Sequence, residues 1–148
     1  MQLTHYTDYS LRVLIFLTLQ EDDRLVTINE IAEHFSIARN HLIKVVQRLG
    51  QLGYVQTVRG KGGGIRIGMP PAKIVIGDVV RDMEANLQII DCSKPPCPLG
   101  GNCELKGILD EAIGAFLDVL NRYTLADLQR EPHQIEKLLR WSPQPAKA

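Results

Sequence analysis

Residues 27–53 read TINEIAEHFSIARNHLIKVVQRLGQLG, and this stretch predicts two short helices joined by a tight turn. Thr27 and Glu30 form the signature of a capping box, in which the hydroxyl and the carboxylate each accept a hydrogen bond from a free backbone amide. Apolar residues at helical spacing indicate the second helix, which ends at Gly53. They are Leu42, Val45, Val46, Leu49 and Leu52. Two helices joined by so short a turn predict a helix-turn-helix.

The opposite face of the second helix carries side chains that can hydrogen-bond base edges or neutralise phosphates. They are Arg39, Asn40, His41, Lys44, Gln47, Arg48 and Gln51. The alternative is an ordinary solvated face, but such a face normally mixes acidic with basic residues. Residues 37–73 contain seven Lys and Arg and no Asp or Glu, although the whole chain has zero net charge. This uneven distribution is typical of nucleic-acid binding, and we predict that the second helix reads DNA.

Residues 54–68 predict a β-hairpin, because two short apolar strands flank the glycine-rich loop RGKGGG at 59–64. A phosphate-binding P-loop is excluded, since no Ser or Thr follows the Gly-Lys pair and a strand rather than a helix follows the glycines. The second reason also excludes a dinucleotide-binding glycine turn. Directly behind a recognition helix, the hairpin is expected to be a wing with basic residues, Arg66 included, at its tip. The expected DNA contacts in its loop are Arg59, Lys61, Gly62 and Gly63.

All three cysteines lie within twelve residues, in the stretch DCSKPPCPLGGNC at 91–103. The prolines and glycines between them prevent a regular helix or strand but allow three thiolates to converge on one point. Pro98 follows Cys97 directly, as in the Cys-Pro step of iron-sulfur sites. We therefore predict a metal centre in this loop.

Three alternative roles for the cysteines are less well supported. A disulfide would leave one odd thiol, and the N-terminus lacks the charged region of a secretory signal. A structural zinc site normally has four closed ligands and closer cysteine pairs. Unrelated buried thiols would account for neither the clustering nor the prolines and glycines. An iron-sulfur cluster held by three thiolates and one unusual fourth ligand is favoured.

Length and composition, at 148 residues and 45% hydrophobic, predict one compact domain with a projecting element. Because no apolar segment is long enough to cross a bilayer and unpaired thiols suit a reducing compartment, we expect a cytoplasmic protein without membrane contact. Residues 7–20 are apolar on nearly every side and predict a buried helix. Asp8 lies in its first turn and Arg12 four residues later, so the two are expected to form an ion pair.

The predicted fold class is mainly α with a small β-hairpin, and the chain is expected to divide into four segments. Residues 1–84 would form a winged helix-turn-helix domain closed by a short helix at 76–84. Residues 85–104 would be a cysteine-rich cluster-binding loop, residues 105–131 a long dimerisation helix with a short cap helix, and residues 132–148 a loose tail.

An apolar stripe runs along the helix that begins at residue 105. It consists of Leu105, Ile108, Leu109, Ala112, Ile113, Phe116, Val119, Leu120 and Tyr123. One small winged domain cannot cover such a stripe, so we expect it to pair with its copy in a homodimer. The two recognition helices would then lie about 34 Å apart, one turn of DNA. The alternative is that the stripe packs back on its own domain.

Together these motifs resemble the Rrf family of bacterial winged-helix regulators over nearly the whole chain. The resemblance is carried by residues 3–9 (LTHYTDY), 30–32 (EIA), 45–49 (VVQRL) and 59–64, and by three cysteines followed by the stripe-bearing helix. It implies a homodimer whose DNA affinity depends on an iron-sulfur cluster held by Cys92, Cys97 and Cys103. We expect a 4Fe-4S cluster in preference to a 2Fe-2S cluster.

The fourth ligand distinguishes branches of this family. Members that regulate cluster biogenesis carry a His three residues after the last cysteine, where this chain has Lys106, a protonated amine that cannot bind iron. A branch that responds to nitric oxide uses an aspartate from the first helix of the partner subunit, and Asp8 stands at that position. His5 is the competing candidate. Arg12 is expected to take up the carboxylate when the cluster releases it, which gives a switch its second arrangement.

The resemblance implies a repressor of nitric-oxide detoxification genes that leaves its operator DNA when nitric oxide attacks the cluster. A relative that senses iron or redox state is an alternative. An iron-sulfur electron carrier is a third possibility from another class, but the acid-free residues 37–73 argue against it. No pairing of a nucleophile with a base indicates an enzyme.

Overall fold

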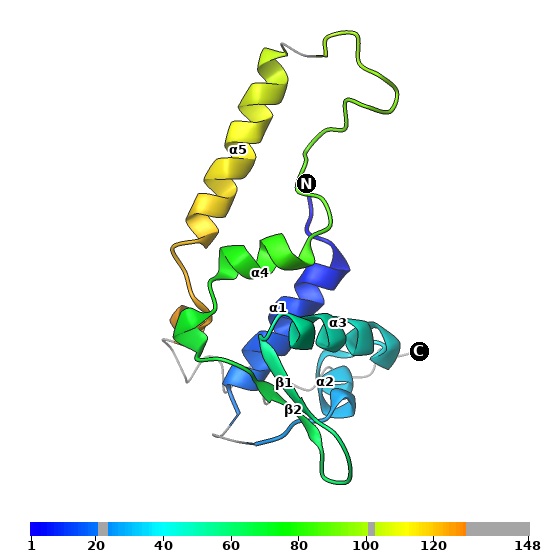
Figure 1. The fold of residues 1–148 in the computed structure, drawn as a ribbon, viewed down its shortest axis with the longest axis vertical. Coiled ribbons are helices and arrows are strands. Elements are labelled where there is room, and N and C mark those ends of the chain that lie inside the picture. Colours follow the sequence, from blue (N-terminus) through cyan, green and yellow to red (C-terminus); the bar gives the residue numbers. More distant parts are fainter. Residues whose placement is uncertain (21–23, 101–102, 130–148) are drawn as a thin grey trace, which may run out of the picture.

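The computed structural model describes residues 1–20, 24–100 and 103–129. These residues are mostly helical and include a two-stranded antiparallel sheet (Figure 1). The elements are α1 (His5–Thr18), α2 (Ile28–Phe35), α3 (Arg39–Gln51), β1 (Val55–Val58), β2 (Gly64–Ile67), η1 (Pro71–Lys73), α4 (Ile76–Met83), α5 (Glu104–Leu120) and η2 (Leu125–Gln129). The predicted fold class, mainly α with a small β-hairpin, is confirmed.

The helix-turn-helix forms where the sequence predicts it. The Thr27 hydroxyl accepts a hydrogen bond from the Glu30 amide at 3.2 Å, and the Glu30 carboxylate accepts one from the Thr27 amide at 2.7 Å. The chain turns between α2 and α3 through Ser36, whose φ of 53° ends α2. The inner side chains of α3 are buried, and they are Leu42, Val45, Val46 and Leu49.

The β-hairpin pairs Val55 with Ile67 and Val58 with Gly64. It is tied to the start of the helix-turn-helix by Val26, which exchanges backbone hydrogen bonds of 2.9 and 2.8 Å with Ile65. The prediction that Arg66 lies at the hairpin tip is wrong. Because β2 already begins at Gly64, Arg66 lies inside the strand, where its Nε donates to Gln56 Oε1 at 2.9 Å.

The core forms around α1, which packs against α3, α4 and β2. Val13 and Leu14 of α1 are fully buried. The chain that follows α5 returns to this core, because the Leu125 amide donates to the Ile74 carbonyl at 2.8 Å and the Leu125 side chain is fully buried. The domain is therefore closed by residues from both ends of the described chain.

Helix α5 projects from the domain, and the loop that carries the cysteines lies near its far end (Figure 1). Its apolar stripe stays open in a single chain, since Leu105 is 59% exposed and Ile108 is 61% exposed. The alternative that the stripe packs back on its own domain is therefore wrong for these residues. The C-terminal half of α5 approaches the domain, where Leu120 packs against the core and Phe116 lines a cavity with Met1 and Leu3.

Several predicted boundaries differ from the structure. The first helix runs from His5 to Thr18 rather than over residues 7–20, because Thr4 caps it and accepts a hydrogen bond from the Thr7 amide. Helix α5 ends at Leu120, and the short helix after it is a 3-10 turn. Residues 130 and 131, at the end of the predicted cap-helix segment, and the predicted loose tail, 132–148, lie outside the described residues.

Candidate DNA interface and metal centre

The outer face of α3 exposes every side chain that the sequence assigned to DNA binding on this helix. Arg39, Asn40, His41, Lys44 and Arg48 are all exposed. Arg39 is also oriented, because its Nε donates a hydrogen bond of 2.8 Å to Asn29 Oδ1 at the start of α2. The helix therefore presents donors and positive charge to solvent while its apolar face is buried.

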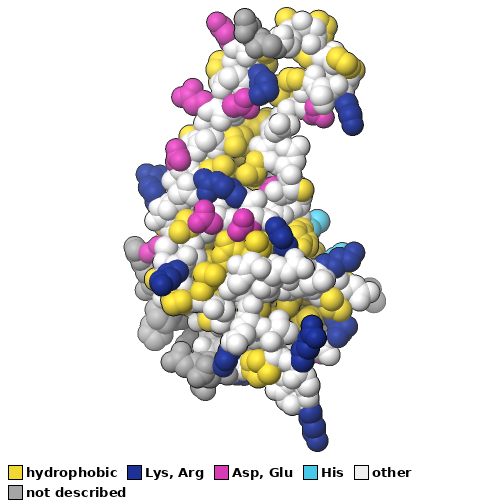
Figure 2. Space-filling view, in the orientation of Figure 1, with side chains coloured by type: hydrophobic (Ala, Val, Ile, Leu, Met, Phe, Trp, Pro, Cys, Tyr) yellow, Lys and Arg dark blue, Asp and Glu magenta, His cyan; other side chains and the backbone are white. Residues whose placement is uncertain are grey.

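The wing completes this surface. Arg59, Lys61 and Gly62 are exposed in the loop between β1 and β2, and Gly63 closes the turn. A Cβ at Gly63 would lie 2.3 Å from the Val58 carbonyl oxygen, so the turn requires glycine there. Figure 2 shows basic side chains around the end of the molecule that carries the hairpin, whereas acidic side chains gather over α4 and α5.

A shallow groove separates the wing from α2 and α3. Its volume is about 220 Å³, and Asn29, Arg39, Thr57 and Gly63 are among the residues that line it. One charged side chain and several polar groups thus face a cleft between the first turns of α2 and α3 and the hairpin. Such a cleft is suited to a phosphate strand held by side chains and backbone amides.

Helix α1 contacts α3 through aromatic side chains. The Tyr6 hydroxyl donates to the Lys44 carbonyl at 3.2 Å. The Tyr9 ring is stacked between His5 and His41, with centroid distances of 5.6 and 6.2 Å. His5 therefore lies beside the recognition helix, and it is absent from the residues that line the cysteine cavity.

The three cysteines line one open cavity of about 660 Å³ at the far end of α5. All three thiols are free and half-buried. Backbone hydrogen bonds shape the first part of the loop, since the Cys97 amide donates to the Cys92 carbonyl and the Gly100 amide to the Cys97 carbonyl, both at 3.0 Å. Over residues 1–20, 24–100 and 103–129, no three His, Cys, Asp or Glu side chains are grouped closely enough to hold a metal ion.

The chemistry of this cavity suits an iron-sulfur cluster. Three thiols are the donors that such clusters use. Lys106 also lines the cavity and donates a hydrogen bond to Asp110. That bond and the Asp110 charge raise the pKa of Lys106, with smaller contributions from Cys92 and Cys103. A cation beside three thiolates would offset part of the negative charge of a bound cluster.

Asp8 does not line the cysteine cavity of its own chain. It forms the expected ion pair with Arg12, whose Nη2 lies 2.9 Å from one carboxylate oxygen and whose Nε donates to the other at 3.0 Å. The Arg12 guanidinium also lies 5.9 Å from the centre of the Phe35 ring in α2. Any contact between Asp8 and the cysteines must therefore involve a second copy or a large movement.

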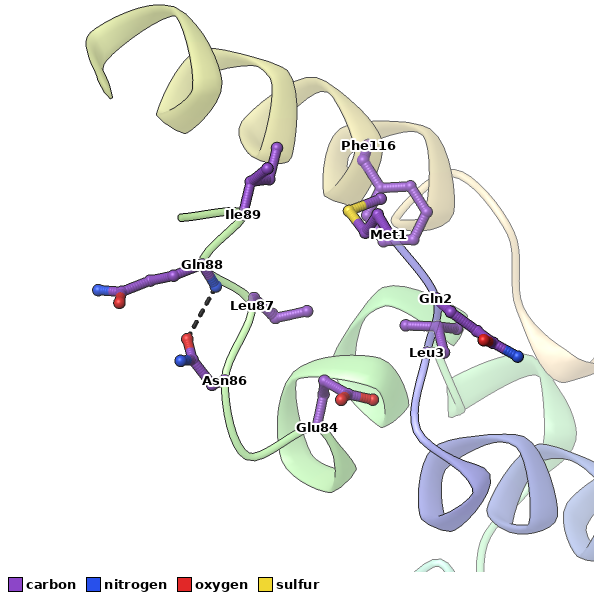
Figure 3. Close-up of a pocket in the computed structure, with 9 residues that line it drawn as sticks. All are labelled: Met1, Gln2, Leu3, Glu84, Asn86, Leu87, Gln88, Ile89 and Phe116. Carbon is purple, nitrogen blue, oxygen red and sulfur yellow. Dashed lines mark hydrogen bonds between the residues drawn. The ribbon is translucent and has the colours of Figure 1, made fainter. Parts of the chain in front are cut away.

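Glu84 is a residue to which sequence reasoning assigned no role. Its carboxylate accepts hydrogen bonds from the Thr4 amide, the Thr4 hydroxyl and the Thr7 hydroxyl. It also lines a cavity of about 190 Å³ between the N-terminal segment, residues 86–89 and α5 (Figure 3). No local motif could reveal this contact, since 80 residues separate Glu84 from Thr4.

Comparison with known protein families identifies the family of this chain. The sequence profile of the Rrf2 family, described as an iron-dependent transcriptional regulator, matches residues 3–131. The chain belongs to the Rrf2 family. This Rrf2 chain is 53% identical over 143 residues to the HTH-type transcriptional regulator NsrR of Bacillus subtilis (strain 168), with 95% of this chain and 98% of that protein covered. It is 48% identical over 143 residues to NsrR of Geobacillus kaustophilus (strain HTA426), with coverages of 95% and 97%.

Solved structures show the same fold for this Rrf2 chain. Oxidised CymR of Staphylococcus aureus superposes with a TM-score of 0.71 at 27% identity, covering 88% of this chain and 98% of that chain. IscR of T. potens superposes with a TM-score of 0.73 at 21% identity, covering 100% and 94%. These likenesses confirm the winged helix-turn-helix architecture. In the part of the chain that the structure describes, no helix is both long enough and apolar enough to span a membrane.

Proposed function

We propose that this Rrf2 regulator is an iron-sulfur-dependent repressor that senses nitric oxide and leaves its operator when the cluster is attacked. The observation that carries the proposal is that three free thiols line one cavity, in a chain that also exposes a basic recognition helix. Its similarity to proteins named NsrR supports the same function. A cytoplasmic location would give it access to chromosomal DNA.

The DNA-binding part of the proposed function is supported by the exposed face of α3. Arg39, Asn40, His41, Lys44 and Arg48 would enter the major groove, where Arg and Asn pair with base edges and Lys binds phosphates. The loop residues Arg59, Lys61, Gly62 and Gly63 would follow the backbone or enter the minor groove. The groove that contains Asn29 and Arg39 would hold the phosphate strand between them.

A homodimer would complete the regulator. The exposed stripe on α5 is too apolar to remain in water, and a second copy offers a matching stripe by two-fold symmetry. Such a dimer presents two recognition helices to half-sites one turn of DNA apart, or about 34 Å.

Cys92, Cys97 and Cys103 would hold the cluster, and Asp8 of the second copy would supply the fourth ligand, with His5 as the competitor. When bound, a 4Fe-4S cluster, favoured over a 2Fe-2S cluster, supplies iron atoms with affinity for nitric oxide. A carboxylate is a hard and weakly held ligand beside thiolates, so Asp8 is the ligand we expect to leave. Arg12 already binds Asp8 in this structure and would stabilise the released carboxylate.

The test of the proposal is oxygen-free purification of the full chain, with absorption spectra, iron and sulfide analysis, and operator binding before and after nitric oxide. We expect a coloured protein that loses operator affinity as nitric oxide is added. Asp8→Ala should alter the spectrum and the nitric-oxide response, whereas His5→Ala should leave both unchanged. Iron-free protein that binds the operator with full affinity would contradict the proposal.

A regulator that senses iron or redox state through the same cysteines is the second candidate. It is favoured by the family description as iron-dependent and by the half-buried, free thiols. Operator binding is measured during titration with nitric oxide, after iron chelation and after mild oxidation. A nitric-oxide sensor should lose its operator only with nitric oxide, whereas an iron or redox sensor should lose it on chelation or oxidation. An electron carrier would bind no DNA, and the exposed basic face of α3 disfavours it.

A further inference from the structure

The first turn of α1 is held by a carboxylate from a distant part of the chain. Glu84 Oε2 accepts hydrogen bonds of 3.1 Å from both the amide and the hydroxyl of Thr4, and a third from the Thr7 hydroxyl. Thr7 is fully buried. Hydrogen bonds to an ionised acceptor are stronger than those between neutral groups. Glu84 is therefore a tertiary clamp on the start of α1.

Glu84 also stands at the base of the cysteine arm, residues 85–103. It ends α4, where its amide donates to the Val80 carbonyl at 2.9 Å, and Cys92 follows eight residues later. In Figure 3 the start of the arm, the N-terminal segment and Phe116 of α5 surround one cavity beside Glu84. The arm therefore begins directly after the residue that holds the start of α1.

The same part of α1 contacts the recognition helix. Tyr6 donates its hydrogen bond to the Lys44 carbonyl, and Tyr9 stacks against His41. Both residues lie within two positions of Thr7 in sequence. The first two turns of α1 therefore contact Glu84 at the base of the arm. They also contact α3, through Tyr6 and Tyr9.

We propose that Glu84 is a positioning residue that couples the cysteine arm to the recognition helix through the start of α1. If the arm moves, Glu84 must either carry α1 with it or give up its hydrogen bond from the buried Thr7 hydroxyl, which is unfavourable because the neutral Thr4 hydroxyl, 3.2 Å away, is a weaker acceptor than a carboxylate. A helix turn moves as a rigid unit, so a shift of α1 displaces Tyr6 and Tyr9 and with them α3. That cluster loss moves the arm rests on the proposed function. The coupling of Glu84 to α3 through α1 does not depend on it.

The first experiment measures amide hydrogen exchange in the cluster-free, full-length protein. Glu84→Ala should speed exchange in residues 5–9 by about tenfold and also speed exchange in residues 41–45 of α3, because the clamp and its contacts loosen together. Thr7→Val removes the buried hydroxyl, with its bonds to Glu84 and Thr4, and should reproduce the effect with the side-chain volume retained. Glu33→Ala, which likewise removes an exposed carboxylate from α2, is the matched control and should leave both regions unchanged.

Faster exchange in residues 5–9 with no change in residues 41–45 would overturn the proposal, since Glu84 would then be only a helix cap. The second experiment compares operator affinity with and without the cluster at matched iron content. A wild-type ratio of about 5–150 corresponds to ordinary allosteric coupling. Glu84→Ala should reduce that ratio by about threefold or more, and Glu33→Ala should preserve it.

An unchanged ratio in Glu84→Ala would also overturn the proposal. If the wild-type ratio is itself one, the proposed cluster dependence fails, and the exchange data decide separately whether Glu84 couples α1 to α3.

Discussion

The hydroxyl of Tyr6 donates a hydrogen bond to the backbone carbonyl of Lys44, and this bond joins α1 to the helix that we expect to read DNA. Its distance is 3.2 Å and the pair is exposed, so its contribution to the free energy of unfolding should be small. Its position matters more than its strength, because it holds α3 at the middle of the basic face.

Tyr6→Phe removes this hydrogen bond and retains the ring. We expect a loss of less than about 1 kcal/mol in the free energy of unfolding, because exposed hydrogen bonds contribute little net stability. Operator affinity should fall a few-fold, since Lys44 and its neighbours become less well positioned. Urea denaturation and fluorescence anisotropy with operator DNA measure the two effects. An affinity equal to wild type would show that this bond does not position α3.

Arg39 and Asn29 should act as a pair in DNA binding. Arg39→Ala should cost about 1–3 kcal/mol of operator-binding free energy if Arg39 contacts a base. If Arg39 instead binds a phosphate, the slope of log affinity against log salt concentration should fall by about one. Asn29→Ala should cost less, and the double variant should lose little beyond Arg39→Ala, because Asn29 acts by orienting Arg39.

Lys73→Ala is the control for this pair, since Lys73 is exposed and basic but lies in η1. Affinity is measured over a range of salt concentrations. Strictly additive losses from the two substitutions would show that Asn29 and Arg39 act independently.

The turn of the wing should not tolerate a side chain at Gly63. In Gly63→Ala the new Cβ would lie 2.3 Å from the Val58 carbonyl and 2.9 Å from the Gly60 carbonyl, so the loop must open. Operator binding should weaken about tenfold or more if the wing contacts the backbone at several phosphates.

Gly50→Ala provides the contrast for the wing, because its Cβ would meet neighbours only at 3.8 Å and alanine favours the helix by about 0.5–1 kcal/mol. Chemical shifts of residues in α1, α2, α3 and α4 show whether the fold outside the wing is retained. A Gly63→Ala protein with wild-type affinity would remove the wing from the DNA interface.

The capping box of α2 predicts a pH dependence of stability. The backbone hydrogen bond from Thr27 lowers the pKa of Glu30 from its ordinary value of 4.5, with smaller contributions from the Thr27 and Arg24 side chains. Because the folded pKa lies below the unfolded one, the carboxylate stabilises the fold above about pH 4.5, and this contribution is lost as the pH falls through the folded pKa.

Glu30→Gln should therefore lose less stability than wild type between about pH 5 and 3. Thr27→Ala should cost about 1 kcal/mol at neutral pH through the lost cap. Thermal unfolding across this pH range measures both effects. Parallel pH profiles for wild type and Glu30→Gln would contradict the assignment.

The stripe on α5 should mediate dimerisation. Ile108→Glu places a charge at a residue that is 61% exposed in the single chain, so the monomer should fold normally while the dimer dissociates. Analytical ultracentrifugation gives the association state, and circular dichroism checks that α5 remains helical. Asp118→Asn, on the exposed polar surface of the same helix, should remain dimeric. A dimeric Ile108→Glu protein would exclude this part of the stripe from the interface.

Local patterns in the sequence determined most of the fold. The capping box at Thr27 and Glu30, the spacing of Leu42, Val45 and Leu49, and the glycine loop each depend on residues a few positions apart. Hydrogen bonds and burial over such short distances are specified by the chain itself, so the helix-turn-helix and the hairpin could be predicted. The family resemblance was carried by the same local motifs. All three cysteines line one cavity, but within the described residues no three ligand side chains are grouped closely enough to hold a metal ion, so the metal centre stays a prediction.

Only the tertiary structure decided how these parts are connected. Glu84 meets Thr4 across 80 residues, Val26 pairs with Ile65, and Tyr6 reaches Lys44. None of these contacts has a periodic signature, because each depends on how whole helices pack rather than on side-chain spacing within one helix.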